Sequence, residues 1–149
     1  MNNELDRVHQ QLTISNISAA RTEPMYDYDA VITVCQDSIE DHIPEEVEYH
    51  FFEMADGPDC RYGGRHDYQY FEYAARTILR HLEEGDTLLV HCHRGRSRSV
   101  STSIAALSVY EETSYEDMQW TVKSRRPHIN PDSLLADHAK KFIKQYGNA

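Results

Sequence analysis

The stretch from Leu88 to Ser103 constrains the fold most, because its pattern changes abruptly. An apolar run ends at Cys92, and an amphipathic run begins at Arg98. This pattern predicts a buried strand, a tight loop and a helix. The five residues between the thiol and the guanidinium are His93, Arg94, Gly95, Arg96 and Ser97. A loop this short closes around one small anion.

The chemistry of the loop favours phosphate. Backbone N–H groups at a helix N-terminus lack intrahelical partners, and the helix dipole attracts negative charge there. The same field stabilises a thiolate, so we expect the pKa of Cys92 to lie below its ordinary value of about 8.5. Arg98 offers a planar fork for two phosphate oxygens, while Gly95 keeps a side chain out of the loop. Ser99 is positioned to donate a hydrogen bond to the sulfur. We predict catalytic roles for Cys92, Arg98 and Ser99, and phosphate binding by the loop from His93 to Arg98.

The rest of the chain alternates between strand and helix patterns. The predicted strands are residues 12–15, 30–35, 47–54 and 87–90, and the predicted helices are residues 68–84, a helix from 98, a short helix after a capping box at 113–117, and 131–146. These elements predict one α/β domain over residues 1–149, with a central, partly parallel sheet of four to five strands and helices on both faces. Ligands bind at the carboxyl ends of the strands in such sheets.

Two motifs carry a resemblance to a known family. His91, Cys92, the five loop residues, Arg98 and Ser99 together resemble the signature of the cysteine-dependent protein phosphatases, and the positions of Gly95 and Ser97 are most similar to the dual-specificity branch. Residues 122–131 are similar to the segment that follows the phosphate loop in that branch. The resemblance implies a phosphotyrosine-phosphatase-like fold and hydrolysis of phosphotyrosine, and of phosphoserine or phosphothreonine, without a cofactor.

The resemblance also implies a general acid upstream of the cysteine. An alkoxide or phenoxide is a poor leaving group unless it is protonated as the bond breaks. Residues 55–67 have turn signals and no periodicity, which predicts a long loop at the end of a strand. We favour Asp56, which is followed by Gly57 and Pro58. Asp59 and Asp67 are the alternatives, and Asp67 also fits the N-cap position of the next helix.

Several other functions stay open on the sequence. The basic loop residues His93, Arg94 and Arg96 would suit a phosphoinositide, a phospholipid head group or an RNA 5′ phosphate end, unless their side chains point outward. A phospho-binding module without turnover and a sulfurtransferase acting through a Cys92 persulfide are further alternatives. The expected partner is a phosphorylated protein.

Charge and cysteine content limit the expected binding partners and the expected cellular compartment. The net charge of −10 argues against general binding to nucleic acids or anionic membranes. Three cysteines without paired spacing do not form a disulfide framework, which indicates a reducing cytoplasm. We find no signal peptide and no apolar run that could span a bilayer.

We expect no metal ion at His91, Cys92 and His93, because adjacent side chains at the end of a strand point in different directions. His91 is expected instead to orient the cysteine by hydrogen bonding, as its counterpart does in the family. Arg125 and Arg126 are interpreted as a solvated helix end rather than a second phosphate site.

Overall fold

A central mixed sheet organises the chain. The computed structural model describes residues 2–59, 61 and 63–147. Within these residues, five strands form one sheet in the order β1-β2-β5-β3-β4. The strands are β1 (Leu5–His9), β2 (Leu12–Ser15), β3 (Ala30–Thr33), β4 (Glu48–Phe51) and β5 (Leu88–His91). β1 runs antiparallel to β2, and the other neighbours are parallel. The predicted partly parallel sheet is confirmed.

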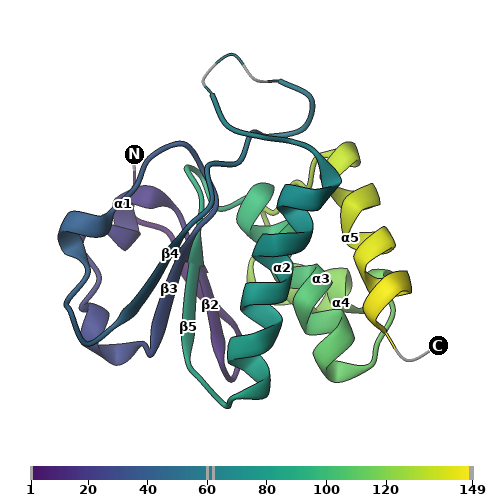
Figure 1. Cartoon of the computed structure of the whole chain (residues 1–149). Helices are drawn as coiled ribbons and strands as arrows, with labels where there is room; N and C mark the ends of the chain where they lie inside the picture. Colours follow the sequence, from purple (N-terminus) through teal and green to yellow (C-terminus); the bar gives the residue numbers. More distant parts are fainter. Residues whose placement is uncertain (1, 60, 62, 148–149) are drawn as a thin grey trace.

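Helices cover both faces of the sheet, as predicted. The elements are α1 (Ile17–Ala20), η1 (Met25–Asp27), η2 (Glu40–His42), α2 (Tyr68–Glu83), α3 (Arg98–Glu111), α4 (Tyr115–Arg125) and α5 (Ser133–Tyr146). Helices α2 to α5 lie together on one face, while α1 lies on the other (Figure 1). Among the described residues, no helix is both long and apolar enough to cross a membrane.

The buried faces of the helices follow the sequence pattern. In α2 the buried stripe is Phe71, Ala74, Ala75, Ile78, Leu79 and Leu82, together with His81. Helix α3 lies between α2 and α5 and is buried from Arg98 to Ser108, so its serines and threonines pack as small side chains (Figure 1). A fully buried side chain such as Phe142 of α5 contributes about 1.5–3 kcal/mol. The helical layer therefore holds the start of α3 firmly against the sheet.

Helix starts are set by capping side chains. Ser114 accepts a hydrogen bond from the Asp117 N–H at 3.1 Å and begins α4, as the capping-box pattern predicts. Asp132 accepts one from the Leu134 N–H at 2.9 Å and begins α5, two residues later than predicted. This later start leaves Asp132 beside the loop that follows β5.

One strand was not predicted. β1 precedes the strand that the sequence indicates as the first, and its polar residues conceal the pattern because it lies at an edge with an exposed Leu5. β5 consequently occupies the centre of the sheet, with β2 and β3 on either side.

Candidate active site

The loop after β5 starts at the carboxyl edge of the central strand. His91, the last residue of β5, is in register with Ser15 of β2 and Thr33 of β3, so three parallel strands end together. Cys92 follows at once, and α3 begins at Arg98. The loop thus lies where ligands bind in parallel sheets, with a helix N-terminus facing it.

Cys92 is buried among hydrogen-bond donors. Its Sγ lies 3.2 Å from Ser99 Oγ and accepts a hydrogen bond from the Gly95 N–H at 3.2 Å. Burial acts to raise the pKa of Cys92, but Arg98, the Ser99 hydroxyl and the loop amides outweigh it and lower the pKa below its ordinary value. A thiolate is therefore favoured at this position.

Cys35, two residues after the end of β3, provides a contrast. It too is a buried free cysteine. Burial raises its pKa to about 11, since its main polar contact is the weakly placed Asp37 carbonyl at 3.6 Å. Cys35 therefore packs as a core residue, while the setting of Cys92 favours the nucleophilic form.

The Arg98 guanidinium is hydrogen-bonded through Nη1 but, in the part of the chain that the structure describes, not through Nε. Its Nη1 donates to Gln36 Oε1 at 2.5 Å and to the Met54 carbonyl at 3.0 Å. Its Nε is buried and has no hydrogen-bond partner within the described residues. A buried guanidinium N–H without a partner costs free energy. A phosphate oxygen in the loop would satisfy it.

Arg126 holds the loop through its backbone carbonyls. Its Nε donates to the Gly95 carbonyl at 2.7 Å and its Nη2 to the Arg94 carbonyl at 3.2 Å, while Nη1 donates to Asp6 Oδ2 at 2.6 Å. The side chain is fully buried. The interpretation of Arg126 as a solvated helix end is therefore wrong, although Arg125 is exposed. Carbonyls held on this outer side leave the loop amides free to point toward Cys92.

Gly95 is required at its position. Its φ is +70°, and an added Cβ would lie 2.6 Å from both the Ser15 carbonyl oxygen and Arg126 Nη2. A side chain there would push the loop away from Arg126. The loop conformation thus depends on both Gly95 and Arg126.

The other basic side chains of the loop are exposed or partly exposed. His93 and Arg94 are exposed. Arg96 is 42% exposed and lies 3.6 Å from Glu4. These three residues lie on the loop predicted to bind phosphate, but their side chains extend into solvent or toward an acidic neighbour.

Asp56 contacts the Cys92 loop by a hydrogen bond with Ser97. The Ser97 hydroxyl donates to Asp56 Oδ1 at 2.6 Å and accepts from the Asp132 N–H at 2.9 Å. Gly57 makes this approach possible, because an added Cβ would lie 2.6 Å from Asp132 Oδ2. Ser97 therefore joins the segment after β4 to the Cys92 loop and to the start of α5.

The two alternative acids bind elsewhere. Asp59 forms an ion pair with Arg61 at 2.8 Å, which lowers the pKa of its exposed carboxyl. Asp67 is the N-cap residue of α2 but makes no side-chain cap, because its carboxylate binds Arg65 at 3.0 Å. Residues 60 and 62 of the predicted loop lie outside the described residues.

His91 links three strands beneath the cysteine. Its Nδ1 lies 3.2 Å from the Cys92 carbonyl, and its Nε2 lies 2.6 Å from Thr33 Oγ1. A carbonyl only accepts, so the neutral ring carries its proton on Nδ1. Burial lowers the pKa of His91 to about 4, which keeps the ring neutral. Thr33 Oγ1 also lies 2.7 Å from the Tyr49 hydroxyl on β4.

Comparison with known proteins identifies the family. Residues 14–144 match the sequence model of the dual specificity phosphatase catalytic domain. Dual specificity protein phosphatase 18 of Pongo abelii is 33% identical over 132 residues, covering 87% of this chain and 67% of its own. Human dual specificity protein phosphatase 22 is 30% identical over 146 residues, covering 97% of this chain and 76% of its own. The chain spans 62% of the Rattus norvegicus phosphatase 18.

Solved structures share the fold. Human DUSP28 gives a TM-score of 0.80 at 21% identity, covering 97% of this chain and 96% of that one. The human tyrosine phosphatase-like serine/threonine/tyrosine-interacting protein gives 0.77 at 22% identity, covering 97% and 99%. The fold and the cysteine loop define a cysteine-based phosphatase. This chain belongs to the dual specificity phosphatase family, as its motifs predict.

Proposed function

We propose that this chain hydrolyses phosphate monoesters on proteins through a phosphocysteine at Cys92. The proposed site consists of the Cys92 thiolate, the amides of residues 93–98, the Arg98 guanidinium, Asp56 and Ser99. The observation that carries the proposal is the buried Arg98 Nε, which has no partner within the described residues and belongs to the same loop whose Gly95 amide contacts Cys92 Sγ. Phosphate oxygens are the acceptors that such donors require.

In the first step the Cys92 thiolate attacks phosphorus in line with the leaving oxygen. A P–S bond forms as the P–O bond breaks. The loop amides and Arg98 bind the equatorial oxygens, where charge is spread in the transition state. Asp56, entering in its protonated form, donates its proton to the departing alkoxide or phenoxide.

In the second step water attacks the phosphocysteine. Asp56, now a carboxylate, takes a proton from the water as the new P–O bond forms and the P–S bond breaks. The sulfur leaves as a thiolate that accepts a hydrogen bond from Ser99 Oγ, 3.2 Å away. Phosphate is released and the starting state of Cys92 is restored. The balance of this cycle requires no metal or organic cofactor.

The proposed substrates are phosphotyrosine and phosphoserine or phosphothreonine residues of proteins, in line with the family. Arg94 is exposed and Arg96 lies 3.6 Å from Glu4, which weakens the case for a phosphoinositide or an RNA 5′ end. The presence of a nucleophile, an arginine and an acid together argues against a module that only binds phosphate. Because the mechanism needs a reduced Cys92, we propose that the protein acts in a reducing compartment such as the cytoplasm.

The test is phosphate release from an aryl phosphate and from a phosphotyrosine peptide, with vanadate as inhibitor. We expect activity in the wild type, none in Cys92→Ser, and a loss in Asp56→Ala that is larger for poor leaving groups. Hydrolysis of phosphoinositides or RNA 5′ phosphate ends in preference to every phosphopeptide would contradict the proposed substrate class. Binding of phosphopeptides without any turnover would contradict catalysis.

A further inference from the structure

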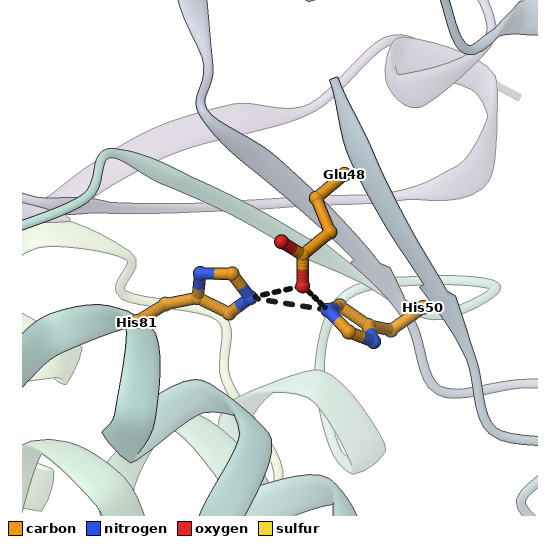
Figure 2. A group of neighbouring side chains, drawn as sticks. All are labelled: Glu48, His50 and His81. Carbon is orange, nitrogen blue, oxygen red and sulfur yellow. Dashed lines mark hydrogen bonds and ion pairs between the residues drawn. The ribbon is translucent and has the colours of Figure 1, made fainter. Parts of the chain in front are cut away.

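A second polar cluster lies at the edge strand β4, with Glu48 at the start of that strand. Glu48 and His50 occupy alternate positions on β4, so their side chains share one face. Glu48 is paired with Ala30, which is paired with Leu88 at the start of β5, whereas Cys92 follows its end. His81, in the last turn of α2, extends toward both from the helix (Figure 2).

Three potential ligand atoms converge in this cluster. His50 Nε2 lies 2.6 Å from Glu48 Oε2 and 3.0 Å from His81 Nε2. His81 Nε2 lies 3.2 Å from the same Glu48 oxygen. Figure 2 shows the two rings and the carboxylate directed at one point between β4 and α2. His81 is 1% exposed, so its ring is shielded from bulk solvent.

The outer nitrogen of His81 is fixed by a carboxylate. Nδ1 lies 2.7 Å from Asp86 Oδ2, in the turn after α2. Because a carboxylate only accepts, a neutral His81 carries its proton on Nδ1 and directs the Nε2 lone pair into the cluster. This carboxylate–histidine arrangement is the one that orients histidine ligands of metal ions.

His50 and Glu48 supply the other two potential ligand atoms. His50 Nε2 and Glu48 Oε2 are hydrogen-bonded at 2.6 Å, so a metal ion would take the place of the proton between them. Two neutral imidazoles and a carboxylate are a ligand set that suits Zn²⁺.

We propose that Glu48, His50 and His81 bind a zinc ion, with water as the fourth ligand and Asp86 as the positioning residue for His81. Ligand atoms about 2.1 Å from a tetrahedral zinc ion are about 3.4 Å apart. The two longer distances in the cluster, 3.0 and 3.2 Å, are close to this value. The 2.6 Å pair opens by movement of Glu48, whose side chain is 50% exposed.

Arg80 competes with the ion. Its Nη2 lies 2.9 Å from Glu48 Oε2 and 3.3 Å from His81 Nε2. Its Nη1 lies 3.1 Å from Glu84, and the Arg80 side chain is 48% exposed. Arg80 can therefore remain paired with Glu84 when zinc takes its place beside Glu48. Its charge makes binding weaker than the ligand set alone would give.

Zinc at this point would tie β4 to α2. These are the elements before and after residues 52–67, the segment that contains Asp56. An ion that binds only the folded chain raises its stability by mass action. The expected effect is a higher melting temperature with added Zn²⁺, independent of phosphatase activity.

The test is metal titration of the chain with Cys92→Ser as the background, which removes a competing thiolate. Competition with a chromophoric chelator gives the Zn²⁺ affinity, and the visible absorption of Co²⁺ reports its coordination number. We expect one equivalent and a four-coordinate Co²⁺ spectrum. His50→Gln should weaken binding about 100-fold and Asp86→Asn about 10-fold, whereas the exposed His42→Asn should leave it unchanged.

Arg80→Gln separates a zinc site from an ion-pair cluster. If zinc binds here, loss of the competing guanidinium should tighten binding about 10-fold. Absence of binding in both the starting protein and Arg80→Gln would overturn the proposal. So would equal affinity in His50→Gln and His42→Asn, or a six-coordinate Co²⁺ spectrum. Circular dichroism of each variant would confirm that it is folded.

Discussion

Ser97→Ala tests how the general acid is positioned. Ser97 is 8% exposed, and its hydroxyl is the one group that joins Asp56 at 2.6 Å to the Asp132 N–H at 2.9 Å among the described residues. Alanine removes the donor to the carboxyl group and leaves the Asp132 N–H without its acceptor. Asp56 then loses its fixed position beside the Cys92 loop.

The size of the effect follows from the contact. Asp56 acts in its protonated form, and a hydrogen bond between uncharged groups contributes about 0.5–1.5 kcal/mol. If most of this free energy holds Asp56 in place, kcat falls about 2-fold to 10-fold for a substrate whose leaving group needs protonation, since about 1.4 kcal/mol is a factor of ten. An aryl phosphate with an acidic phenol needs little protonation, so its kcat should stay close to the wild-type value.

The assay is steady-state phosphate release from a phosphotyrosine peptide and from an aryl phosphate with an acidic phenol. Ser103→Ala is the matched control, because Ser103 Oγ is buried on α3 without a hydrogen-bond partner in the described part of the chain. It should behave as wild type. Equal losses for both substrates, or no loss for either, would refute positioning of Asp56 by Ser97.

Three further outcomes follow from the loop contacts. Gly95→Ala should reduce activity more than 100-fold, measured by phosphate release, because its Cβ would meet the Ser15 carbonyl. Arg126→Lys should lower both kcat and the melting temperature, because it leaves the Gly95 and Arg94 carbonyls without their paired donors. Unchanged values would contradict the role of Arg126 in holding the loop. Ser99→Ala removes a hydrogen bond that lowers the pKa of Cys92, so the pH profile of thiol alkylation by iodoacetamide should move to higher pH, and a shift to lower pH would argue against this contact.

The sequence predicts the elements that carry strong periodicity. The α2 stripe and the strand, loop and helix around Cys92 are where the pattern places them, because burial on one face fixes the spacing of apolar residues. The β1 strand could not be predicted in this way, because an edge strand exposes polar side chains and needs little apolar alternation.

Contacts between distant residues could not be predicted. Arg126 lies 31 residues from Gly95 in the sequence, and an arginine at the end of a helix has the same local pattern whether it is buried or solvated. Gln36 and Thr33 likewise reach Arg98 and His91 only through the order of strands in the sheet. The placement of Asp56 depends on its contact with Ser97, 41 residues away. The spacing of neighbouring residues in the sequence does not indicate such long-range contacts.

The proposed zinc site illustrates the same limit. Glu48 and His50 show strand spacing, but His81 is 31 residues beyond His50, which does not match a local ligand motif. The sequence draws attention instead to residues 91–93, where we expect no metal ion. Proximity in the fold, rather than spacing, brings histidines of β4 and α2 together.

The most direct test of the central claim is to trap the covalent intermediate. The reaction with a phosphotyrosine peptide is quenched with acid within one turnover, and peptides of the enzyme are analysed by mass spectrometry. The account predicts phosphate on Cys92 in the wild type, and neither covalent phosphate nor turnover in Cys92→Ser. Phosphate on His91 or His93, or turnover by Cys92→Ser at the wild-type rate, would contradict it.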